Sequence, residues 1–231
     1  GTSVNAPKAY AEVASKALAE VSGIPVVLST NLIEATWDTG AYVQTSGVLK
    51  RIAVKLSKIC NDLRLLSSGP RTGINEINLP RLQPGSSIMP GKVNPVIPEV
   101  VSQVAFDIIG KDVTITMAAE AGQLELNVME PIIAFSLSNG IHRLRQAMRT
   151  LQDRCVSGIT ANKERCRSMV ENSIGIITAL NPYLGYETSA SIAKEALETG
   201  GSVIDIVLAR NLLSREKLDD ILAPEHMINR K

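Results

Sequence analysis

The sequence predicts an all-α protein, in which a bundle of long helices is followed by a small C-terminal helical domain. Apolar residues recur every three or four positions over long stretches, which is typical of amphipathic helices. The composition is rich in Ala, Leu, Ile and Val but only 3% aromatic, a mixture suited to helix packing. With 231 residues and 45% hydrophobic side chains, the chain can bury a sizeable core. We place the bundle domain at 1–157 and the small domain at 158–231.

The first long helix is expected at 39–66, where apolar positions repeat every seven residues in two interleaved series. The series are Tyr42, Leu49, Leu56 and Leu63, and Thr45, Ile52, Ile59 and Leu66. This alternation is a heptad seam. Ala53 and Cys60 widen the apolar stripe, which favours a multi-helix bundle over a two-stranded coil. A helix of about 40 Å exceeds a compact domain of this size, so we expect it to pack along equally long helices.

A loop rich in proline and glycine follows over 69–98, and a loop of about 30 residues is far longer than an ordinary connection. Helical spacing resumes at 95–120. Within it, 112–117 is β-branched and compatible with a strand, but its neighbours keep the helical period, so we predict helix. A third long helix is expected at 126–155, with a possible kink at Pro131.

Beyond Gly158 the pattern changes to short helices, each preceded by a residue that can cap it. The candidate caps are Asn162, Thr188, Ser202 with Asp205 as a capping box, and Ser214. The pair 202–211 and 214–222 resembles a helix-turn-helix. It lacks a basic recognition face, so packing is the better explanation.

Charge and composition exclude several partners. The formal net charge of +1 favours neither nucleic acid nor an anionic membrane, and no apolar run approaches a membrane-spanning length or forms a signal peptide. His142 and His226 are the only histidines, which excludes a histidine-rich metal site.

Three widely spaced cysteines are typical of reduced thiols in a cytoplasmic protein. The chain begins at Gly1 without an initiator Met, and we expect the protein to start earlier.

The densest group of reactive side chains lies at 85–95. A phosphate-binding P-loop is excluded because five residues separate Gly85 from Gly91 and valine follows Lys92. Lys92 and Asn94 could together bind a carboxylate, by charge and by N–H donation. A serine beside them is a weak base unless backbone N–H groups stabilise its alkoxide. The alternative is a surface loop with incidental polar residues.

Residues 85–95 match the signature Gly-Ser-x-x-Met-x-x-Lys-x-Asn, and by it the chain resembles the fumarase/aspartase superfamily over its whole length. Within that superfamily, 69–80, 94–100 and 118–131 resemble aspartate ammonia-lyases. The resemblance implies a carbon–nitrogen lyase that converts L-aspartate to fumarate and ammonia without metal or other cofactor. It also implies a homotetramer with a core of long helices and active sites shared between subunits. The chain resembles the second half of such a subunit, so it is expected to be inactive alone.

The resemblance assigns roles to individual residues. Ser86, on a flexible loop, corresponds to the base that removes the Cβ proton of the substrate. Removal of this proton gives a stabilised aci-carboxylate. Glu99 corresponds to an acid that supports the histidine of a neighbouring subunit, and we count it with Ser86 as catalytic. The implied substrate-binding residues are Ser87, Lys92, Val93 and Asn94. The implied ligand is a dicarboxylate, and no metal-binding residue is implied.

Three alternatives remain open. Fumarate hydratase shares the signature loop and differs in the groups that contact the leaving group. Argininosuccinate and adenylosuccinate lyases resemble the chain less well through 69–80. A non-catalytic helical scaffold, as in some lens crystallins of this superfamily, is the alternative from another class, but a scaffold needs none of Ser86, Lys92 and Asn94.

Overall fold

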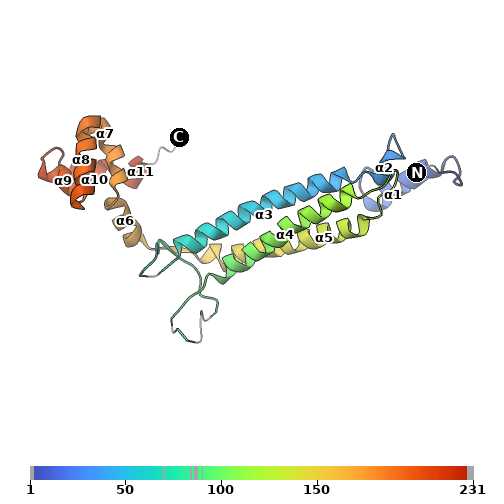
Figure 1. The fold of residues 1–231 in the computed structure, drawn as a ribbon, viewed down its shortest axis with the longest axis horizontal. Helices are drawn as coiled ribbons and strands as arrows, with labels where there is room; N and C mark the ends of the chain where they lie inside the picture. Colours follow the sequence, from blue (N-terminus) through green and yellow to red (C-terminus); the bar gives the residue numbers. More distant parts are fainter. Residues whose placement is uncertain (1–2, 70, 84, 86–87, 90, 228–231) are drawn as a thin grey trace. The chain divides into compact units, whose positions relative to one another are not determined.

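The computed structural model describes residues 3–69, 71–83, 85, 88–89 and 91–227. Over these residues the regular structure is helical apart from two strands of two residues each, which confirms the predicted fold class (Figure 1). Contacts divide the chain into one unit of Gly1–Leu66 with Leu79–Ile159 and a second of Ser67–Asn78 with Thr160–Lys231. The domain boundary at 157/158 stays a prediction. No helix in the described part of the chain is both long and apolar enough to cross a membrane.

Three long antiparallel helices form the body of the first unit. They are α3 (Gly40–Leu66), α4 (Val96–Glu120) and α5 (Glu130–Arg154), with α4 running against both neighbours (Figure 1). The predicted helices at 39–66 and 95–120 are confirmed to within one residue, including the β-branched stretch in α4. The third begins later than the expected residue 126.

The late start of α5 and its proline have local causes. The Asn127 amide donates to the Ala118 carbonyl at 3.0 Å and accepts from the Met129 backbone N–H at 2.8 Å, so these residues form a turn rather than helix. Pro131 occupies the first turn of α5, where its missing N–H removes no helical hydrogen bond. The expected kink at Pro131 was therefore wrong.

The bundle core consists of three successive layers of buried side chains. These layers are Ile115, Ala118, Ile133 and Leu137; then Ala53, Ala105, Ile108 and Leu144; then Cys60, Val101, Ala147, Leu151 and Cys155. The face that α3 buries carries small residues, with Ala53 and Cys60 fully enclosed. The seam residues Leu49, Leu56 and Leu63 are only half-buried beside these layers.

One charged group is buried between α3 and α4. Asp112 accepts a hydrogen bond from the Ser46 hydroxyl at 2.8 Å and one from Lys50 Nζ at 3.0 Å. Burial acts to raise the pKa of Asp112, but these hydrogen bonds and the Lys50 charge outweigh it and leave that pKa below its usual value. Asp112 is therefore held ionised inside the bundle.

Two shorter helices precede the bundle in sequence. They are α1 (Tyr10–Ser22) and α2 (Glu34–Trp37), and neither contributes a buried residue. Helix α1 ends at Gly23, whose φ of 68° lies in the left-handed region that closes many helices.

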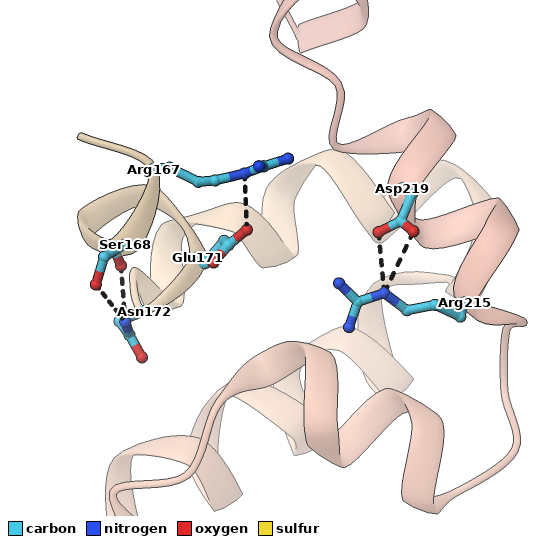
Figure 2. A network of polar contacts seen from close by, with 6 residues as sticks. All are labelled: Arg167, Ser168, Glu171, Asn172, Arg215 and Asp219. Atoms are coloured by element: carbon cyan, nitrogen blue, oxygen red, sulfur yellow. Dashed lines mark hydrogen bonds and ion pairs between the residues drawn. The ribbon is translucent and has the colours of Figure 1, made fainter. Parts of the chain in front are cut away.

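The second unit packs short helices around an aliphatic core. They are α6 (Lys163–Glu171), α7 (Ile177–Leu184), α8 (Tyr186–Thr199), α9 (Val203–Ala209), α10 (Arg215–Ile221) and α11 (Pro224–Met227), with 3₁₀ turns at Val156–Gly158 in the first unit and Ile174–Ile176 in the second. Val207 of α9 and Leu218 of α10 are both fully buried in this core, as the packing explanation for that helix pair expects. Exposed ion pairs such as Arg167–Glu171 on α6 and Arg215–Asp219 on α10 decorate the surface (Figure 2).

The predicted helix caps have mixed outcomes. Ser202 and Ser214 are confirmed as caps, since their hydroxyls accept from the backbone N–H groups of Ile204 at 3.2 Å and Lys217 at 3.3 Å. The capping box expected between Ser202 and Asp205 is wrong, because the Ser202 hydroxyl accepts from Ile204 and not from Asp205. Thr188 is wrong as a cap, because α8 already begins at Tyr186, directly after Gly185. Asn162 does occupy the N-cap position of α6, but its side chain makes no capping hydrogen bond.

The two strands form a minimal antiparallel ladder. Strand β1 (Ile77–Asn78) pairs with β2 (Thr160–Ala161), so that Ile77 faces Ala161 and Asn78 faces Thr160. Residues 77–78 fall within the loop predicted over 69–98, and no strand is predicted at 160–161, because two residues are too few to show the alternation that identifies a strand.

Candidate functional site

The loop that carries the signature is closed by hydrogen bonds between its ends. The Gly85 N–H donates to the Lys92 carbonyl at 3.0 Å, and the Asn94 amide donates to the Gly85 carbonyl at 3.1 Å. The Lys92 N–H donates to the Met89 carbonyl at 3.2 Å. Ser86 and Ser87 lie outside the described residues. The described part of the loop is thus a turn closed by hydrogen bonds.

The closure requires glycine at position 85. A Cβ on Gly85 would lie 2.4 Å from the Lys92 carbonyl oxygen, closer than real Cβ contacts allow. Gly91 has a φ of 79°, a conformation that side-chain-bearing residues rarely adopt. Gly85 of the signature, and Gly91 at one of its unspecified positions, therefore serve the backbone of the turn.

Three of the four predicted binding residues are consecutive in sequence and lie at the end of this turn, and Ser87, the fourth, lies outside the described residues. Lys92 and Val93 are exposed and Asn94 is half-buried, directly before α4. Glu99 is half-buried in the first turn of α4, where a negative charge is favoured by the helix dipole. A flexible cation beside a fixed amide N–H suits a carboxylate ligand. The turn therefore offers the cation and N–H donor that carboxylate binding requires.

A cluster of three asparagines in the second unit was not predicted from the sequence. Asn162 and Asn78 form a reciprocal amide pair, with Asn78 Nδ2 donating to Asn162 Oδ1 at 2.6 Å and Asn162 Nδ2 donating to Asn78 Oδ1 at 3.1 Å. Asn162 Nδ2 also lies 2.9 Å from the Asn75 carbonyl oxygen. These partners are 84 and 87 residues apart in sequence, so no local pattern could have indicated them.

The cysteines and histidines do not gather into a site in the described part of the chain. Burial raises the pKa of Cys60 to about 11, with a further increase from nearby Cys155, and burial also raises the pKa of Cys155. All three cysteines are free. His142 and His226 are exposed. Among the described residues, no three His, Cys, Asp or Glu side chains are grouped closely enough to hold a metal ion.

Two family models match the chain over most of its length. The model described as "Lyase" matches residues 1–110, and the model described as "Fumarase C C-terminus" matches residues 176–229. Aspartate ammonia-lyase from Helicobacter pylori is 61% identical over 229 residues, covering 99% of this chain and 49% of that protein. The chain belongs to the fumarase/aspartase superfamily.

Solved structures of fumarase/aspartase superfamily proteins share the fold. Fumarate lyase:delta crystallin from Brucella melitensis, solved with cobalt bound, superposes with a TM-score of 0.93 at 55% identity, covering 98% of this chain and 49% of that one. The class II fumarase from Schistosoma mansoni superposes with a TM-score of 0.88 at 34% identity, covering 98% of this chain and 50% of that one. The chain spans about half the length of the curated relatives it matches.

Proposed function

We propose that the chain supplies part of the active site of an aspartate ammonia-lyase, which converts L-aspartate to fumarate and ammonia. One observation carries the proposal. The chain is 61% identical to aspartate ammonia-lyase from Helicobacter pylori, against 34% to the Schistosoma mansoni fumarase, over nearly the same residues. The signature loop serves both reactions, so the remainder of the chain favours the ammonia-lyase.

The reaction begins with a carbon acid that needs help to ionise. The hydrogen on the carbon next to a carboxylate is barely acidic, because its removal leaves a doubly negative aci-carboxylate. In the proposed mechanism the Ser86 alkoxide takes the Cβ proton, and the C–H electron pair moves into the adjacent carboxylate. The electrons then return to form the Cα–Cβ double bond as the C–N bond breaks and ammonia leaves. No metal or organic cofactor takes part in these steps.

Lys92, Val93 and Asn94 are proposed to hold the carboxylate that accepts the charge. The Asn94 amide has two N–H groups, and only one is needed for its 3.1 Å hydrogen bond to the Gly85 carbonyl. The other N–H, the Val93 backbone N–H and the Lys92 ammonium would then stabilise the dianion more than the substrate. Preorganised donors of this kind account for large rate effects. Ser87 is proposed to contact the substrate beside Ser86.

Glu99 is proposed to support a histidine of a neighbouring subunit, as the corresponding acid does in the superfamily. Its place in the first turn of α4, five residues after Asn94, keeps it close in sequence to the carboxylate site. The α4 dipole at that end favours the ionised carboxylate, which is the form that would orient a histidine.

The active assembly is proposed to be a homotetramer. Large apolar side chains on the bundle helices are exposed in the single chain. They include Val54, Phe106, Val113, Met117 and Phe135, each more than half exposed. Exposed apolar surface of this extent is typical of a protein–protein interface. Packing the bundles of several subunits together would cover it.

The decisive experiment offers aspartate and malate separately to the assembled full-length protein and follows fumarate. We expect ammonia and fumarate from aspartate, addition of ammonia to fumarate in reverse, and poor use of malate. Efficient malate use without ammonia release from aspartate would instead support fumarate hydratase. A tetramer inactive on both would favour the scaffold alternative.

Two variants test the assigned roles. Ser86→Ala should abolish proton abstraction while substrate still binds, since only the base is lost. Lys92→Ala should lower kcat and raise KM together, because the ammonium contacts both substrate and dianion. Near-normal turnover in Ser86→Ala would contradict the base assignment and move it to Ser87.

A further inference from the structure

The asparagine cluster fixes a strip of backbone in the second unit. Alongside the Asn78–Asn162 amide pair, the Asn162 backbone N–H donates to the Glu76 carbonyl at 2.8 Å. Arg165 Nε donates to the Ile74 carbonyl at 3.2 Å. With the β1–β2 ladder, these bonds attach 73–78 along its length to 160–165.

The cluster is maintained at a local cost, which argues that it is more than incidental. Asn75 has a φ of 52°, a left-handed conformation that asparagine tolerates but does not prefer. The Asn162 side chain, although at the N-cap of α6, binds Asn75 and Asn78 instead of the first turn. A capping bond typically contributes about 1 kcal/mol, and this helix forgoes it.

The fixed strip leads directly into the segment that carries the signature loop. Asn78 is followed by Leu79, and the loop closes at Gly85 only seven residues after Asn78. Pro80, two residues after Asn78, packs so tightly on Gly158 that a Cβ there would lie 2.6 Å from the proline ring. A short connection containing prolines has little freedom to absorb a displacement at its start.

We propose that Asn162 is a positioning residue for the loop that carries Lys92 and Asn94: through the amide pair with Asn78 it sets the point from which this loop departs. The proposal rests on the proposed ammonia-lyase function. Asn162 acts through the backbone and touches no reacting atom. Small displacements of substrate-binding groups can cost up to about 100-fold in rate, so a flexible anchor should be visible in the kinetics.

The experiment uses the assembled full-length protein with three variants. Asn162→Ala removes the amide, and Asn162→Asp keeps the acceptor for Asn78 Nδ2 but loses the donor. Asn172→Ala is the matched control, because Asn172 follows the last residue of α6 and, among the described residues, its amide donates to Ser168 alone, at 2.7 Å to the carbonyl oxygen (Figure 2). Hydrogen exchange of peptides covering 73–78 and 79–95, and kcat and KM for aspartate, are measured on each.

For Asn162→Ala we expect exchange in both peptides to accelerate about tenfold and KM to rise about tenfold while kcat falls. Asn162→Asp should lie between this variant and the wild type, and Asn172→Ala should match the wild type. Exchange in α3 and α5 should stay unchanged. If Asn162→Ala only reduced the fraction of folded enzyme, its apparent kcat would fall while KM stayed unchanged. That result would overturn the proposal.

The outcomes separate this proposal from the proposed function. Unchanged exchange in 79–95 overturns the positioning role, and so does accelerated exchange with unchanged kinetics in an active enzyme. If the wild type releases no ammonia from aspartate, the ammonia-lyase proposal fails and the exchange of 79–95 decides the positioning role alone. Should Asn162→Ala fail to fold, Asn162→Asp and Asn78→Ala provide the same comparison.

Discussion

The two units of the chain differ in how completely they cover their large apolar side chains. In the second unit, large aliphatic residues such as Leu180, Ile192 and Leu218 are fully enclosed by helices of the same unit. In the bundle, α3 buries small residues, while Phe106 and Phe135 are 59% and 63% exposed. The small unit therefore completes its core within one chain, whereas the bundle leaves apolar surface for other helices to cover.

The largest effect is expected in the enclosed core of the small unit. The substitution Leu218→Ala should lower the free energy of unfolding of the second unit by about 2–5 kcal/mol, because the shorter side chain leaves a cavity that rigid neighbours cannot fill. Urea unfolding followed by circular dichroism measures the change. Leu197→Ala, at a position 69% exposed, is the control and should stay within about 0.5 kcal/mol. Equal losses in the two variants would show that the core is not closed.

An alkaline-pH effect should be specific to the bundle. The pKa of Cys60 is raised from 9.0 to about 11, so the folded state holds this thiol proton more tightly than the unfolded state. The resulting stability is fully present below pH 9 and is lost as the pH rises to about 11, amounting to roughly 3 kcal/mol. Melting temperatures measured between pH 8 and 11 should fall less steeply for Cys60→Ala than for the wild type. Cys166→Ala should retain the wild-type decline.

The buried carboxylate of the bundle should give a smaller effect at acidic pH. Asp112→Asn should cost about 2 kcal/mol at pH 7, because Ser46 and Lys50 lose a charged acceptor. The pKa of Asp112 is lowered, so its contribution is present above the unfolded value near 4 and is lost as the pH falls through the folded value. Stability of the variant should therefore depend less on pH below 4. Asp62→Asn, in an exposed pair with Lys58, should change little.

The smallest effect on folding, with a separate effect on assembly, is expected on the exposed bundle face. Phe106→Ser should change the unfolding free energy of the single chain by less than about 0.5 kcal/mol. It should nevertheless weaken the proposed tetramer in sedimentation experiments on the full-length protein. Leu197→Ser, on the small unit, should leave both quantities unchanged. Weaker assembly in both variants would remove the distinction between the units.

The helices could be predicted where apolar periodicity runs for many turns, as in the 27 residues of α3. Periodicity identifies the apolar stripe but not which of its residues pack against helices of the same chain. The half-burial of the seam leucines could therefore not be predicted from the sequence. Ile141 and Met148 continue the three- and four-residue spacing of apolar residues along α5, yet both are exposed. Thr188 failed as a cap because the backbone at Gly185 decides where α8 begins.

The candidate site was predictable to a different degree. The signature indicated Lys92 and Asn94 as neighbours, but not that the Asn94 amide and Gly85 close the turn. The asparagine cluster was missed because its members approach one another only after the intervening chain has folded. The roles of Ser86, Ser87, Val93 and Glu99 rest on the resemblance and stay predictions.

The β1–β2 ladder has a consequence for the order of folding. Asn78 and Thr160 are 82 residues apart, and closing a flexible loop of that length costs roughly 4 kcal/mol of chain entropy. Helices α4 and α5 lie between them as an antiparallel hairpin, which returns the chain toward its starting point once it has formed (Figure 1). Strand β1 is synthesised long before its partner and gains little by pairing until that hairpin exists. We therefore expect the ladder, and the asparagine cluster beside it, to form after the folding transition state.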